Sequence, residues 1–259
     1  MRLLAAEFRK LTYQRAMWGL LTAAVLFSAL GTAATAVIFD QSSDGLGFGT
    51  LEDQVVVDSV YANAISGYIF AVLVGVLIVA GEFRHGTAVA TYVAAPRRGQ
   101  VFLAKLIASL VAGVVLMIVS TAGGIAAGMI ALEFYPEAAD PSVDIFVNTS
   151  LAAIVSGAVL GVLGASIAAL IRSQIISLIG VLIWLFAIEP ILLLLFPDQG
   201  KFFLQGLITA IMALDVESEQ FNLNTADFTD PLSATLLLLG YAVVFAILSM
   251  IVSIRRDVE

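Results

Sequence analysis

The chain alternates between long apolar runs and short polar segments. Six of the runs are long enough to cross a bilayer as helices, because the hydrocarbon core requires about 20 residues. These runs cover residues 17–39, 61–81, 101–132, 151–171, 175–196 and 232–254. The third run exceeds the required length, so we expect one continuous helix that begins below the membrane or is strongly tilted. The pattern predicts an all-α integral membrane protein with six spans, forming a single transmembrane domain over residues 1–259.

An amphipathic segment precedes the first span. Within residues 2–15, Leu4, Phe8 and Leu11 share one helical face, and Trp18 follows as an interface anchor. The opposite face holds the basic residues Arg2, Arg9 and Lys10. We interpret this segment as an elbow helix on the inner leaflet. A cleaved secretory signal is the competing interpretation, but the apolar run that follows is longer than a usual signal core.

The sequence also predicts a short hairpin, a short outer helix and close packing between helices. Residues 172–174 alone join the fourth and fifth spans, which predicts a tight cytoplasmic hairpin. The stretch from Phe202 to Leu214 is apolar but too short to cross, so we expect a re-entrant or interfacial outer helix within about residues 201–220. Small residues recur at spacings that allow close helix packing: Gly124, Gly128, Gly157, Gly161 and Gly164.

Charge orients the spans. Of the 12 Lys and Arg residues, all but Lys201 fall in segments that an even number of spans places inside, whereas 15 of the 20 acids fall in outer loops. Because basic residues are retained on the cytoplasmic side, we expect a multi-pass protein of a bacterial plasma membrane with both termini in the cytoplasm. The 61% hydrophobic and 12% charged composition excludes an ordinary soluble domain. Nothing indicates nucleic-acid binding.

Catalytic chemistry is sparse. The chain has no cysteine and one histidine, His85, so thiolate sites, histidine-built metal centres and Ser-His-Asp triads are disfavoured. No phosphate-binding G-x-x-x-x-G-K-[ST] motif surrounds any of the three lysines. We therefore expect no catalytic residue, no metal and no cofactor in this chain, and any ATP-driven work requires another polypeptide.

The most informative polar stretch is residues 82–105, between the second and third spans. Gly86 and Thr87 are typical of a turn and an N-cap, and Pro96 ends the pattern. Apolar side chains follow the cap at i, i+3 and i+4 spacing: Val89, Tyr92 and Val93. Fixed positive charges surround them: Arg84, Arg97, Arg98 and Lys105. The spacing predicts a short amphipathic helix on the cytoplasmic surface.

This stretch resembles the ABC-2-type permease family, in which E-x-R-x-G-T leaves the second span and a proline, two arginines and a lysine lead into the third. The matching positions are Glu82, Arg84, Gly86, Thr87, Pro96, Arg97, Arg98 and Lys105. The PRR and the elbow sequence EFRKL are similar to those of actinobacterial efflux permeases. In that family the segment is a coupling helix held in a cleft of a separate ATP-binding subunit. The resemblance implies a coupling role for the matching positions from Glu82 to Arg98 and for Phe83 and Tyr92.

The resemblance also implies partners. They are two copies of an ATPase subunit, which would bind ATP and Mg, and a second permease chain, identical or paralogous. It implies outward movement of a hydrophobic or amphiphilic cargo such as a drug, antibiotic, lipid or peptide. Arg9, Lys10 and Lys105 would anchor the chain at the inner surface. The Ala, Val and Thr content of residues 88–95 gives modest helix propensity, so we expect this helix to order when its partner binds.

Two acids bear on mechanism. We expect Glu82 to interact with the N-terminus of the coupling helix, with Arg84 or with the ATPase. Glu189, followed by Pro190, is the single acid well inside a span, where a carboxylate costs some ~2.5–3.5 kcal/mol. It marks either a pathway or outer gate, or a contact with water at the outer lip beside a Pro190 kink.

Other classes of function remain open. An ion-coupled secondary transporter would require coupled acids or a broken helix near the midplane, and the pair at 189–190 alone points that way. A passive membrane immunity protein requires only the spans. An intramembrane enzyme would require a nucleophile with an activating base, and the serines and threonines within the spans have no histidine or lysine beside them.

Overall fold

The computed structural model describes residues 2–42, 50–84, 86–87, 98–212, 217–218, 223–224 and 230–255. Within this part, six helices are long and apolar enough to cross a membrane: Arg15–Asp40, Gln54–Arg84, Gly99–Leu132, Val143–Ile171, Gln174–Leu195 and Pro231–Val252. The prediction of an all-helical protein with six spans is confirmed.

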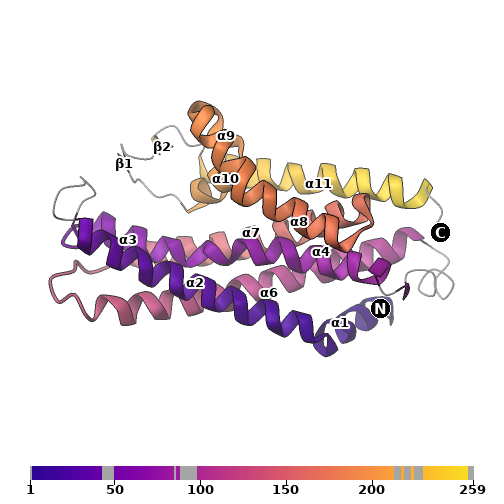
Figure 1. Ribbon diagram of the computed structural model, residues 1–259, viewed down its shortest axis with the longest axis horizontal. Coiled ribbons are helices and arrows are strands. Elements are labelled where there is room, and N and C mark those ends of the chain that lie inside the picture. The colour runs from indigo at the N-terminus through magenta and orange to yellow at the C-terminus, as the bar shows by residue number, and fades with distance from the viewer. Residues whose placement is uncertain are drawn as a thin grey trace.

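The secondary structure elements are almost all helices (Figure 1). In chain order they are α1 (Arg2–Tyr13), α2 (Arg15–Ser42), α3 (Gln54–Ala62), the 3₁₀ helix η1 (Asn63–Gly67), α4 (Tyr68–Arg84), α6 (Arg98–Leu132), α7 (Val143–Ile171), α8 (Gln174–Ile183), the π-helical turn η2 (Trp184–Ile188), α9 (Glu189–Leu195), the 3₁₀ helix η3 (Pro197–Phe202), α10 (Leu204–Ile211), strands β1 (Glu217–Ser218) and β2 (Leu223–Asn224), and α11 (Pro231–Arg255). The strands form an antiparallel pair with Glu217 opposite Asn224.

Helices α2, α4, α6 and α7 form the long axis of the molecule, with α8, α9 and α11 along one side (Figure 1). Helix α4 is the most enclosed of them, because every residue from 71 to 80 is buried. Helix α1, the start of α6 and the end of α11 lie at the same end of the bundle. That arrangement follows from the even number of spans between them.

Glycines allow the central helices to approach closely. A Cβ at Gly75 of α4 would collide with the backbone of Gly161 and Ala165 on α7, and one at Gly113 of α6 would collide with the Gly157 carbonyl. The glycines predicted to pack do so: Gly157, Gly161 and Gly164 face α6 or α4, and Gly124 and Gly128 face residues of α2, α3 and η1. Backbone contact of this kind joins α4, α6 and α7 into one compact unit.

Two helix starts lie earlier than hydropathy alone predicts. The second span extends back to Gln54 and the fourth to Val143, because polar residues cap or enter these first turns. The Ser142 hydroxyl accepts a hydrogen bond from the amide of Ile145 at 3.2 Å, which caps the N-terminus of α7. The long third run is a single helix of 35 residues, as predicted.

The hairpin between α7 and α8 is as short as predicted. Arg172 ends α7 in the left-handed conformation, with φ 58°, and Ser173 caps α8. At the other end of the bundle, η3 and α10 occupy the predicted outer segment. Leu207 and Ala210 of α10 pack against α7 and α11. The position of α10 relative to the bilayer remains a prediction.

Candidate functional site

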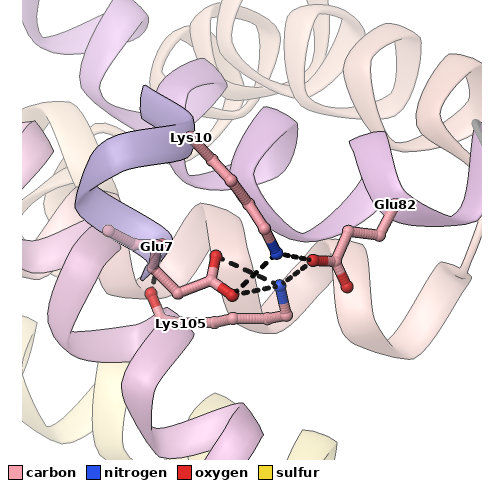
Figure 2. A network of polar contacts seen from close by, with 5 residues as sticks. Glu7, Lys10, Glu82 and Lys105 are labelled. Carbon is pink, nitrogen blue, oxygen red and sulfur yellow. Dashed lines mark hydrogen bonds and ion pairs between the residues drawn. The ribbon is translucent and has the colours of Figure 1, made fainter. Parts of the chain in front are cut away.

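Four charged side chains converge where α1, α4 and α6 meet. Glu7 and Lys10 come from α1, Glu82 from the last turn of α4 and Lys105 from the beginning of α6 (Figure 2). We call these four residues the inner charge cluster. The partners are distant in sequence, since 98 residues separate Glu7 from Lys105 and 72 separate Lys10 from Glu82.

Each lysine bridges both carboxylates. The Lys105 Nζ lies 2.6 Å from Glu82 Oε1 and 3.2 Å from Glu7 Oε1. The Lys10 Nζ lies 2.7 Å from Glu82 Oε1 and 3.1 Å from Glu7 Oε1. The cluster therefore has two positive and two negative charges, and every ammonium group has two acceptors within hydrogen-bonding distance.

Burial makes this pairing consequential. Lys105 is 3% exposed, Glu7 5% and Glu82 8%, whereas the Lys10 side chain is about half exposed. A buried ion pair is strongly destabilised when one partner is removed, because the remaining charge stays desolvated. Burial lowers the pKa of Lys10, but the carboxylates of Glu82 and Glu7 outweigh it and the pKa lies above 10.5. Lys10 therefore stays charged at neutral pH, and its contribution is lost only in strongly alkaline solution.

A second buried acid lies toward the opposite end of the bundle. Glu189 is 0% exposed, and its Oε1 accepts a hydrogen bond from the backbone amide of Gln205 at 2.5 Å. That amide belongs to the first turn of α10, whose own N-cap residue, Phe203, makes no side-chain cap. Glu189 thus caps α10 from a different helix, because its Oε1 accepts one of the amides that the first turn leaves without an intrahelical partner.

The turn η2 brings Glu189 to this position. Buried residues on the fifth span recur at Ser177, Val181, Leu185 and Glu189, four residues apart. In a regular α-helix of 3.6 residues per turn, side chains four residues apart drift gradually around the helix and leave the buried face. The π-helical turn at 184–188 has more residues per turn, so it compensates for this drift and keeps Glu189 on the buried face. Of the two alternatives for Glu189, contact with water at an outer lip does not agree with this structure, because the side chain is fully buried; the alternative of a pathway or outer gate stays a prediction. Pro190 is the second residue of α9 and lies directly after the π-helical turn.

Comparison with known families decides the class of protein. The model of the ABC-2 family transporter proteins matches residues 3–187, which include all four members of the inner charge cluster. The chain belongs to the ABC-2 transporter family. Members of this family are membrane subunits of transporters rather than catalytic enzymes, and they normally work with an ABC ATPase subunit. No curated protein matches the chain in a sequence comparison.

The resemblance assigns a coupling role to residues at the end of α4 and at the start of α6 in this ABC-2 permease. Phe83 is half-buried against the core, whereas Arg84, Gly86 and Thr87 are exposed. Gly86 has φ +66°, a conformation that glycine adopts without strain. Arg98 is the first residue of α6. Residues 85 and 88–97, including Tyr92, Pro96 and Arg97, lie outside the described residues, and so does the predicted coupling helix.

The structure corrects the expected partner of Glu82 within the permease. Its carboxylate is bound by Lys10 of α1 and Lys105 of α6 instead of pairing with Arg84. Two of the predicted surface anchors, Lys10 and Lys105, are members of the cluster. Arg9 is exposed on α1, and its role as an anchor stays a prediction.

Sequence reasoning missed Glu7. It is the single acid of α1, and it lies beside the apolar stripe of a helix whose other charged residues are basic. Lys105 gives the matching signal, since it follows apolar residues from the start of the third run onward. An acid and a base at the apolar edges of two helices are candidates for a buried pair, because each is costly there alone.

Proposed function

We propose that this permease is the membrane subunit of an ATP-driven exporter, and that the inner charge cluster transmits the movement of the ATPase to the spans. The observation that supports this is the position of the cluster. Glu82 and Lys105 lie on either side of the basic segment at 85–97, and they are joined at 2.6 Å. The two ends of the segment are therefore tied to each other and, through Glu7 and Lys10, to α1.

The mechanical consequence follows from the connections. A force on the segment at 85–97 would act on α4 and α6 together, because Glu82 and Lys105 hold their ends at a fixed separation. The same ion pairs would move α1, which continues into α2 after Gln14. In this proposal one docking site tilts three spans in concert, while the glycine contacts between α4, α6 and α7 keep their relative positions.

The remaining assignments rest on the family and on charge. We propose two ATPase subunits that supply ATP and Mg, a second permease chain, and a hydrophobic or amphiphilic cargo moved outward. The distribution of basic residues supports a plasma-membrane orientation with both termini in the cytoplasm. The match to the ABC-2 family supports an ATPase partner, which the alternative of an ion-coupled secondary transporter would not need.

Arg84 provides a direct test of docking, because it is exposed and its replacement leaves the cluster intact. We expect Arg84→Ala to weaken the ATPase–permease complex about tenfold, the typical effect of losing an interfacial arginine. The measurement is co-purification in mild detergent with the ATPase encoded nearest to this gene, followed by titration of the two purified components.

Lys201→Ala serves as the control, since Lys201 is the one basic residue predicted on the outer side, and this variant should bind like the wild type. A permease that purifies without any ATP-hydrolysing companion, or that binds the ATPase equally well with and without Arg84, contradicts the proposed docking site. The first outcome would favour the ion-coupled alternative and direct attention to Glu189.

We also propose that Glu189 and Pro190 belong to an outer gate in which α10 is the moving part. The cap that Glu189 provides is the contact that would open. Glu189→Leu removes the acceptor of the Gln205 amide, and we expect α10 to detach about ten times more often, in line with the loss of a helix cap. Glu189→Gln retains an acceptor oxygen and should behave nearly as the wild type.

The absence of cysteine from the sequence allows a clean measurement of this opening. Leu207 of α10 is fully buried, so a Leu207→Cys reporter reacts with a maleimide only when α10 moves. Faster labelling in the Leu variant than in the Gln variant supports the cap. Equal rates in all three backgrounds would show that Glu189 does not hold α10.

A further inference from the structure

One of the two carboxyl oxygens of Glu189 has no partner. Oε1 accepts the hydrogen bond from the Gln205 amide, whereas the buried Oε2 forms no hydrogen bond within the described part of the chain. No described basic side chain forms a salt bridge with this carboxyl group. Lys201 of η3, at the same end of the fifth span, lies over the Phe202 ring at 5.6 Å instead. The acid is therefore fully buried, satisfied at one oxygen and not paired with a described cation.

Protonation of Glu189 does not remove this deficit. An ionised carboxylate leaves Oε2 as an acceptor without a donor, and a proton on Oε2 makes it a donor without an acceptor. A buried polar atom without a partner costs free energy in either form. Inside a membrane span the ionised form is costly unless a cation pairs with it. A group that brings both a positive charge and N–H donors would meet both requirements.

The surroundings of the carboxyl group favour an organic cation over a metal ion. Tyr68 at the start of α4 is close enough to Glu189 for an electrostatic interaction, and Trp184 of the π-helical turn lies beside the same carboxyl group. Tyrosine and tryptophan rings attract organic cations. A divalent metal ion requires several oxygen ligands, and no group of three acidic or histidine side chains that could hold one occurs among the described residues.

The predicted outer side of the bundle would also attract cations. Lys201 is the single basic residue assigned to that side. A surface with an excess of one charge raises the local concentration of molecules of the opposite charge. Exposed carboxylates lie in or next to the described connections between spans on this side: Glu52, Asp53, Glu133, Glu137, Asp140, Asp144, Asp198 and Asp230.

From these observations we propose that Glu189 binds the protonated amine of an amphiphilic cation, and that Oε2 accepts its N–H. Glu189 lies within the fifth span, Gln174–Leu195, so the ligand needs an apolar part that partitions into the membrane. The proposal assigns a class of cargo to the outer gate described above. It rests on that gate, because the enclosed carboxyl group becomes accessible when α10 moves.

The test asks whether an amine protects Glu189 from dicyclohexylcarbodiimide, an apolar reagent for carboxyl groups. The full-length permease in mild detergent is labelled at neutral pH with dodecylamine or dodecanol present, which share one alkyl chain and differ in charge. Mass spectrometry quantifies the modification at Glu189. We expect dodecylamine to halve the labelling at a concentration about tenfold lower than dodecanol requires, the advantage of a charge-assisted hydrogen bond to a buried carboxylate.

A variant separates the charge of Glu189 from its capping role. Glu189→Gln keeps an acceptor for the Gln205 amide and removes the negative charge. We expect it to bind radiolabelled dodecylamine about tenfold more weakly than the wild type. Glu137→Gln is the matched control, because it removes one exposed carboxylate from the same predicted side. Its affinity should equal that of the wild type.

Four results would contradict the proposal. Equal protection by dodecylamine and dodecanol would indicate an apolar site without a role for charge, and no protection by either would mean that the carboxyl group holds only a proton. A Glu189 that the carbodiimide never modifies would be out of reach of apolar molecules. Equal affinity of the two Gln variants for dodecylamine would exclude Glu189 as its partner. Failure of the gate itself has a different readout, the maleimide labelling at Leu207→Cys.

Discussion

Replacing Lys105 with methionine is expected to destabilise the permease by about 3–5 kcal/mol, the range observed when one partner of a buried ion pair is removed. Lys105 is 3% exposed and bridges Glu7 and Glu82. Without it, two buried carboxylates share the single, half-exposed ammonium of Lys10. A loss of this size corresponds to a melting temperature lowered by about 10 °C in detergent. Scanning fluorimetry of the purified chain measures it.

The double variant Lys105→Met with Glu82→Gln distinguishes charge from shape. It leaves Glu7 paired with Lys10, so the cluster regains neutrality and a substantial part of the lost stability should return. Lys201→Met, a lysine outside the cluster, should change the melting temperature little. Equal destabilisation in the single and the double variant would mean that the ion pairs are not the source of the effect.

The same double variant bears on coupling. If the cluster transmits motion, a folded permease without the bridge between Glu82 and Lys105 should still bind its ATPase through the exposed Arg84, yet should transport little. Binding and transport then separate, which distinguishes transmission from docking. A double variant that transports normally would show that the covalent connection between α4 and α6 suffices.

Replacing Gly75 with alanine is expected to cost about 3 kcal/mol, at the upper end of the range for overpacked cores. A Cβ at this position would overlap the Gly161 carbonyl and approach the Ala165 amide. These are backbone atoms of α7, so no side-chain rotation relieves the collision and the two helices must separate. Because α4 is buried along its middle, separation also disturbs its contact with α6. Melting temperature and yield of folded protein in detergent measure the effect.

Two other glycines of the permease provide controls at which alanine should not reduce stability. A Cβ at Gly180 of α8 or Gly240 of α11 would meet no atom within 4 Å. Because glycine is about 1 kcal/mol less favourable than alanine inside a helix, alanine at either site should be neutral or slightly stabilising. A loss of stability at Gly180 equal to that at Gly75 would contradict the packing explanation.

Much of the architecture was accessible from the sequence. Bilayer thickness imposes a minimum length on any spanning helix, so hydropathy alone located the six spans. The cost of moving basic residues across the membrane predicts which loops lie on the cytoplasmic side, and this orientation stays a prediction. Close helix packing in lipid depends on small residues, and their spacing at Gly157, Gly161 and Gly164 identified contacts that the structure contains.

The partners of the charged residues were not accessible in this way. Glu82 was expected to act locally, toward Arg84 or the segment that follows, because local sequence reveals only local partners. The helix packing instead turns it toward Lys10 and Lys105. Similarly, an α-helical count to Glu189 could not include the π-helical turn before it, since that turn is a departure from the regular period.

What the sequence by itself determined is therefore the number of spans and the membership of the ABC-2 family, because hydrophobicity and motif spacing are properties of contiguous residues. Only the tertiary structure decided that Glu7 contacts Lys105, 98 positions later in the chain. It also decided that Glu189 caps α10, whose own N-cap residue makes no side-chain hydrogen bond. Such pairings depend on how helices rotate and cross, and packing of the whole bundle sets those angles.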